Sequence, residues 1–152
     1  MNTPTTDAMR TDSFVSAELY TQVQQFYARQ MGLIDDRFPE EWAATFTEEA
    51  VFEEASRIDP LHGREAIAAS CRARAERLEA EQIDFRHWLA MLDVRPQPDG
   101  TLRTRAYALA MRTGRGGPLD IFASVVCRDE LVRSGELWLV RHRELQHDGV
   151  ER

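Results

Sequence analysis

The stretch Leu33–Glu54, LIDDRFPEEWAATFTEEAVFEE, holds the densest set of structural signals in the chain. An amphipathic pattern enters it from Tyr20 and predicts a helix that ends near Gly32. Pro39 stands where a second, short helix would begin, a position at which its missing N–H costs nothing. Alternating residues then predict a strand over 50–54. The expected order is helix, acidic turn, short helix, strand.

Composition narrows the class of protein. A chain of 152 residues with 43% hydrophobic and 30% charged residues is typical of one globular domain, expected over 13–148. A net charge of −7 without a basic stripe argues against nucleic acid as a partner. No apolar run reaches the ~20 residues of a membrane span, so no membrane partner is expected. The polar residues 1–12 predict a frayed tail without a signal peptide, and the cytoplasm is the expected location.

The second half of the chain changes from helical to alternating periodicity. A third helix is expected over 64–81, with Ile67, Cys71, Ala75 and Leu78 on its apolar stripe. Four long strands are then expected over 83–95, 102–113, 118–133 and 136–147. Their short, turn-rich connections predict an antiparallel meander, and their length predicts bulges and a strong bend. The predicted fold is an α+β cone, with three N-terminal helices packed on a strongly curved, mostly antiparallel sheet that encloses a pocket.

Strand alternation assigns side chains to the two faces of this sheet. On the first long strand, Phe85, His87 and Met91 would share one face, opposite Trp88, Leu92 and Val94. Both faces are apolar, so one is expected to meet the helices and the other a partner subunit. We therefore expect a homodimer through the outer sheet face, where the apolar residues that need cover would be Trp88, Leu92, Phe122 and Val126.

Three blocks in the right order carry a family resemblance. The acidic turn with its Trp helix and FTEEAVFEE, then GREAIAA, then DELVRSGELWLVRHREL resemble the NTF2-like superfamily and its SnoaL-like branch. The first block is also similar to the small β subunits of ring-hydroxylating dioxygenases. The resemblance covers nearly everything from Tyr20 to Asp148. It implies the cone fold, which carries polyketide cyclases, dehydratases, isomerases, epoxide hydrolases and binding or assembly subunits.

The resemblance also implies a catalytic pair. In scytalone-dehydratase-like members, an Asp after the first helix and a His early in the first long strand meet in the pocket, and here these are Asp35 and His87. A carboxylate at one ring nitrogen fixes the tautomer, so the other nitrogen can exchange a proton. Without the family, Asp35 could be a turn cap and His87 a core histidine. The family's pocket tyrosine is replaced by Glu54, so scytalone dehydration itself is not expected.

Six further residues are candidates for binding a substrate, and each has a structural alternative. Glu54 could be a second pocket carboxylate or could face water, and the hydroxyl of Tyr107 could reach the pocket or pack. The alternative for Tyr27 is a core position, and for Cys127, which stands where the family carries a pocket amide, it is an inert thiol. The full set is Glu54, Tyr107, Phe85, Met91, Tyr27 and Cys127. His62, His142 and His147 lack metal-ligand spacing, so neither a metal nor an organic cofactor is expected.

Three function classes follow. The first is a cofactor-free SnoaL-like enzyme that performs cyclisation, dehydration or isomerisation by acid–base chemistry on a hydrophobic, polyketide-derived small molecule. The second is a small, non-catalytic subunit of a ring-hydroxylating oxygenase. The third is a ligand-binding protein without turnover. The apolar strand faces favour the first class, because such walls suit a hydrophobic ligand held by a few polar groups.

Overall fold

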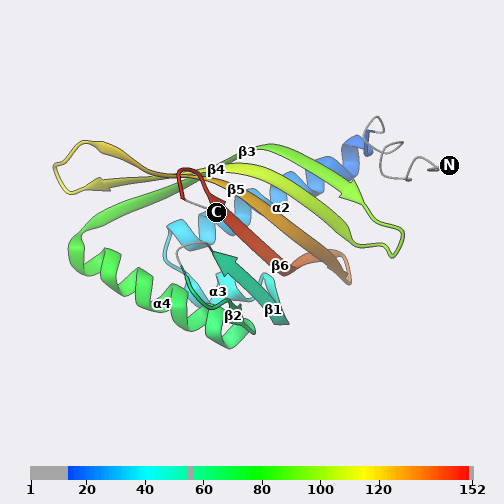
Figure 1. Ribbon diagram of the computed structural model, residues 1–152, viewed down its shortest axis with the longest axis horizontal. Coiled ribbons are helices and arrows are strands. Elements are labelled where there is room, and N and C mark those ends of the chain that lie inside the picture. Colours follow the sequence, from blue (N-terminus) through cyan, green and yellow to red (C-terminus); the bar gives the residue numbers. More distant parts are fainter. Residues whose placement is uncertain (1–13, 55–56, 151–152) are drawn as a thin grey trace.

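The computed structural model describes residues 14–54 and 57–150. The tail expected over 1–12 lies outside these ranges. The elements, drawn in Figure 1, are α2 (Ala17–Asp35), α3 (Pro39–Ala43), β1 (Phe46–Glu54), β2 (Leu61–His62), α4 (Arg64–Glu81), β3 (Ile83–Pro96), β4 (Leu102–Gly114), β5 (Leu119–Ser134) and β6 (Leu137–His147). None of the helices in the described part of the chain is long and apolar enough to span a membrane.

Local signals set the ends of the helices. Ser16 caps α2 by accepting a hydrogen bond of 3.1 Å from the backbone N–H of Leu19. The helix ends at Asp35, and Arg37 just beyond it has a left-handed φ of 65°. α3 begins at Pro39, as predicted. α4 has the predicted bounds and ends where Gln82 turns left-handed.

The six strands form one mixed sheet in the order β2-β1-β6-β5-β4-β3. β1 runs parallel to β6 and every other pairing is antiparallel, which confirms the predicted α+β fold. The sheet is not closed. β1 begins at Phe46, earlier than predicted, because Phe46 is fully buried against the ring of Trp42. The two-residue β2, predicted as loop, pairs with β1 at the sheet edge.

The helices cover one face of the sheet, which we call the inner face. α2 and α4 both contact β3, and α4 also contacts β1 (Figure 1). Residues from both layers form the main hydrophobic core, which includes Val23, Phe46, Ile67, Leu131 and Val140. Each of these five side chains is fully or almost fully buried.

A bulge in β3 corrects the predicted faces of that strand. The pairing register with β4 shifts between Ala90 and Asp93, and Met91 has a left-handed φ of 55°. The extra residue reverses the alternation, so Leu92 and Val94 pack in the core instead of facing outward. Met91 is 73% exposed and does not share the face of His87.

A second bulge, in the pairing of β4 with β5, affects the predicted dimer face. Phe122 lies at this register shift and packs edge-on against the ring of Phe85, on the inner face. Leu92 and Phe122 therefore do not belong to the outer face, whereas Trp88 is 66% exposed there. The homodimer stays a prediction, and light scattering of the protein in solution would test it.

Candidate functional site

Asp35 and His87 form a doubly hydrogen-bonded pair at the edge of the sheet. Asp35 is the last residue of α2, and its Oδ1 lies 2.6 Å from Nδ1 of the His87 ring. Its Oδ2 accepts a second bond of 2.9 Å from the backbone N–H of His87. This N–H is available because β3 is an edge strand, and its outward-pointing groups have no neighbouring strand to bind. The expected contact is therefore present.

This geometry gives the imidazole a defined tautomer. An ionised carboxylate only accepts, so the neutral ring carries its hydrogen on Nδ1 and leaves a lone pair on Nε2. No residue in the described ranges forms a hydrogen bond with Nε2. The Asp35 side chain is 9% exposed and that of His87 is 20% exposed. The ring can therefore meet a ligand while its partner stays shielded.

Small apolar residues surround His87 on the inner face. Pairing places His87 beside Ala110, which in turn pairs with Ala123, and places Leu89 beside Ala108, which in turn pairs with Val125. Leu89, Ala108 and Ala123 keep part of their surface accessible, although they face the helix layer. The helices therefore leave part of this apolar floor open. Phe85, predicted to bind substrate, borders it with its ring 5.1 Å from the His87 ring.

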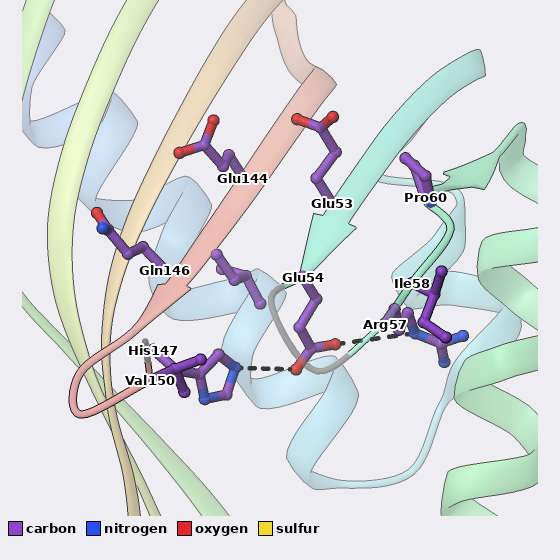
Figure 2. A pocket seen from close by; sticks show the side chains of 10 residues that line it. Glu53, Glu54, Arg57, Ile58, Pro60, Glu144, Gln146, His147 and Val150 are labelled. Atoms are coloured by element: carbon purple, nitrogen blue, oxygen red, sulfur yellow. Dashed lines mark hydrogen bonds and ion pairs between the residues drawn. The ribbon is translucent and has the colours of Figure 1, made fainter. Parts of the chain in front are cut away.

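A second histidine–carboxylate pair lies across the sheet. His147 Nε2 is 3.1 Å from Oε1 of Glu54, and Arg57 approaches Glu54 from the other side at 3.9 Å. These residues line a cleft of about 400 Å³ at the C-terminal ends of β1 and β6, and Figure 2 shows Glu54 between His147 and Arg57. His147 pairs with Val125, so it lies on the inner face too. Asp35 and His87 do not line this cleft.

Arg74 is a partly buried arginine whose guanidinium lies over the Phe85 ring. It lies on α4 with its guanidinium carbon 4.2 Å from the centre of the Phe85 ring. Burial lowers the pKa of Arg74, and the carboxylates of Asp35 and Glu54 both act in the opposite direction. The Arg74 guanidinium thus interacts electrostatically with the carboxylates of both Asp35 and Glu54. Sequence analysis assigned this part of the apolar stripe to Ala75 and missed Arg74.

Tyr27 and Cys127 lie deeper than the site. The Tyr27 hydroxyl donates a bond of 2.7 Å to Asp129, and the Cys127 thiol lies 3.5 Å from the same carboxylate. Burial, followed by the charge of Asp129, raises the pKa of both Tyr27 and Cys127. Arg143 completes the network with two bonds to Asp129, of 2.9 and 2.8 Å. Both candidates therefore belong to a buried network with Asp129 and Arg143, and their contact with a substrate stays a prediction.

Tyr107 and Met91 lie outside the site. Tyr107 pairs with Ala90 and Val126 on the outer face, is 47% exposed, and has the guanidinium of Arg105 5.0 Å from its ring centre. The bulge puts Met91 in solvent. Of the six predicted binding residues, Phe85 lies next to His87 on the inner face, whereas Glu54 lies in the cleft with His147. No three His, Cys, Asp or Glu side chains of the described ranges are grouped so that they could hold a metal ion.

Comparison with solved structures first defines the fold. An NTF2-like protein with a cystatin-like fold from Novosphingobium aromaticivorans has a TM-score of 0.76 and 22% identity, over 99% of this chain and 94% of the other. The architecture is therefore NTF2-like. The family model of the SnoaL-like domain matches residues 15–144, and the chain belongs to the SnoaL-like family.

Two bacterial proteins show the similarity at higher sequence identity. Aln2 from a Streptomyces species is 38% identical, with a TM-score of 0.82 over 90% of this chain and 95% of that protein. A protein from Catenulispora acidiphila, solved in complex with S-DNPA, is 37% identical, with a TM-score of 0.75 over 88% and 96% of the two chains. No curated protein sequence matches the chain.

Proposed function

We propose that this protein is a cofactor-free SnoaL-like enzyme that performs acid–base chemistry on a hydrophobic, polyketide-derived small molecule. The reaction class is cyclisation, dehydration or isomerisation. His87 is the general base and acid, and Asp35 is its positioning residue. The observation that carries this proposal is the doubly held Asp35–His87 pair, which leaves Nε2 unbonded beside a partly open apolar floor.

The proposed chemistry follows from the tautomer of the His87 imidazole, which carries its lone pair on Nε2. Nε2 removes a proton from a carbon next to a substrate carbonyl, and the electron pair of the broken C–H bond moves into an enolate. The imidazolium that forms is stabilised by the Asp35 carboxylate at Nδ1. The same proton then returns, either to a departing hydroxyl, which leaves as water, or to another carbon of the substrate. Neither sequence of steps consumes an oxidant or a reductant.

A variant of His87 tests the proposal. S-DNPA is the first substrate to try, because the 37% identical Catenulispora protein was solved in complex with it. If wild-type protein converts S-DNPA, we expect His87→Ala to lower kcat by about 10²- to 10⁴-fold, the usual loss for a positioned acid–base group. Product formation is followed by liquid chromatography, and unfolding curves check that the fold is intact.

His142→Ala is the matched control for that variant. His142 also pairs with a carboxylate, Glu53, at 2.8 Å, but both side chains are exposed. Its removal should leave kcat within about twofold of wild type, as expected for a surface substitution away from the site. Turnover by His87→Ala at the wild-type rate would disprove the assigned mechanism.

A second candidate function is binding without turnover. The complex of the Catenulispora protein favours it, since that structure shows a relative holding a ligand. Tight binding of S-DNPA by wild-type protein, with no product after prolonged incubation, would support this alternative over the enzyme.

A further inference from the structure

We propose that Arg74 binds a carboxylate group of the ligand, so that the natural ligand is an aromatic or polycyclic acid and not a neutral ring compound. This inference rests on the proposed function, because it assumes that a hydrophobic ligand occupies the inner face next to His87. It adds the chemical class of that ligand and one specificity-determining residue.

The position of Arg74 on α4 is unusual for a charged residue. The buried stripe of this helix is formed by Ile67, Cys71 and Leu78. Arg74 falls three residues after Cys71 and four before Leu78, so it continues the stripe that faces the sheet. Its side chain is partly buried, and this burial lowers its pKa. Burying a charged group raises the free energy of the folded state unless an opposite charge or a hydrogen-bonding group pairs with it.

Arg74 lacks such a partner among the residues that the structure describes. Its guanidinium stacks on Phe85, but forms no hydrogen bond or ion pair with any residue in 14–54 or 57–150. The guanidinium groups of five other arginines in these ranges also lack one, and all five residues are exposed to solvent: Arg29, Arg77, Arg103, Arg115 and Arg133. Arg74 is the one that is partly buried. The guanidinium offers a planar fork of N–H groups that matches a carboxylate.

The two nearby carboxylates are already engaged. Asp35 is bound to His87 through both oxygens, and Glu54 is bound to His147 and faces Arg57. Each raises the pKa of Arg74 through space without forming a hydrogen bond to it. Neither carboxylate completes the guanidinium, so we assign its acceptor to a bound ligand.

The Phe85 ring lies close to both Arg74, the proposed carboxylate-binding residue, and His87. It lies 4.2 Å from the Arg74 guanidinium and 5.1 Å from the His87 ring. A ligand with its carboxylate at Arg74 would place an attached ring over the alanines beside His87. Arg74 thus fixes which carbon of the ligand reaches Nε2.

A matched pair of probes tests this assignment by isothermal titration calorimetry. Naphthylacetate carries an apolar double ring and a carboxylate, and naphthylacetamide has the same shape without the charge. We expect wild-type protein to bind the acid at least about 10-fold more tightly than the amide, because a charge-assisted bond is the stronger one. Arg74→Met should weaken binding of the acid by about 10- to 100-fold and change binding of the amide by less than about threefold, because it removes charge-assisted hydrogen bonds and keeps the apolar volume.

Two further variants make the result specific. Arg77→Met removes an exposed charge one turn away on the same helix and should leave the preference for the acid unchanged. Arg74→Lys keeps the charge but not the fork, so it should retain part of the preference and serves as the test if Arg74→Met does not fold.

The outcomes separate the two proposals. Equal binding of acid and amide by wild type, with neither altered in Arg74→Met, overturns the role of Arg74 but leaves a site for hydrophobic rings. Loss of the preference in Arg77→Met as well would show a diffuse effect of charge and also overturns it. Failure of both probes to bind at millimolar concentration refutes the hydrophobic site itself, and the role of Arg74 with it.

Discussion

Two arginines lie between the helices and the sheet, and they differ in what surrounds them. Arg143 has a side chain only 4% exposed and binds both oxygens of the fully buried Asp129. It also donates to Gln30 and lies 5.2 Å from the centre of the Phe46 ring. Arg74 has one aromatic neighbour and no bound acceptor among the described residues.

The two arginines differ in whether described residues of the chain neutralise the buried charge. Burial lowers the pKa of Arg143, but the adjoining Asp129 more than compensates, so its pKa lies above the usual range. The pKa of Arg74 is lowered, because its burial is not compensated to the same degree. A buried cation whose partners are all internal holds the fold together, whereas one without partners is available to a ligand. Three substitutions test this contrast.

The largest effect is expected for Arg143→Met. Removing one member of a buried ion pair leaves Asp129 charged and without its partner, which costs about 3–5 kcal/mol of the free energy of unfolding. Urea unfolding followed by circular dichroism measures this loss. Arg141→Met is the control, because Arg141 pairs with Glu130 at the surface and should cost no more than about 1 kcal/mol. Equal losses in the two variants would remove the contrast.

A smaller loss is expected for Tyr27→Phe. The Tyr27 hydroxyl bonds to Asp129 and to Thr104, and both groups are buried. Without it, the free energy of unfolding should fall by about 1–3 kcal/mol, the usual cost of leaving a buried polar group unsatisfied. In Tyr107→Phe the lost hydroxyl is exposed, so the change should stay within about 0.5 kcal/mol. A Tyr27→Phe protein as stable as wild type would show that the network is not structural at this position.

The smallest effect on stability is expected for Arg74→Met. The lost interaction with the Phe85 ring, worth about 0.5–1 kcal/mol, is offset by relief of a partly desolvated charge. The free energy of unfolding should therefore change by less than about 1 kcal/mol. A loss as large as that of Arg143→Met would show that Arg74 supports the fold and would contradict the contrast drawn above.

Sequence was sufficient for features that depend on local pattern. The bounds of α4 follow from its helical periodicity between Gly63 and the residues around Gln82. The Asp35–His87 contact followed from the family resemblance together with the position of each residue relative to its element. The bounds of α4 required only the local pattern, whereas the Asp35–His87 contact also required the family resemblance.

Features that depend on register or on long-range pairing were missed. Nothing in the letters around Met91 indicates a bulge, yet a single extra residue moves Leu92 and Val94 to the opposite face. The contact of Glu54 with His147 requires β1 to lie parallel to β6, and these strands are separated by most of the chain. Arg74 was missed because an arginine in a helical pattern is ordinarily placed on the solvated face.

Side chains from the helix layer and the turn after it bind three of the free backbone groups on edge strand β3. The Tyr20 hydroxyl donates to the carbonyl of Leu92 at 2.9 Å, Arg37 donates to the carbonyl of Ile83, and Asp35 accepts from the N–H of His87. Unpaired groups along a long edge strand are a template on which a strand of another molecule can form. We therefore expect these three contacts to hinder aggregation through β3.

We therefore expect Asp35 to limit aggregation at this edge as well as to orient the imidazole. A substitution that removes its carboxylate frees the N–H of His87 at the sheet edge at the same time as it releases the ring. A fall in the measured rate of such a variant combines two effects: slower proton transfer in each molecule and a lower concentration of soluble protein. Only the rate per soluble, monodisperse protein reports on proton transfer.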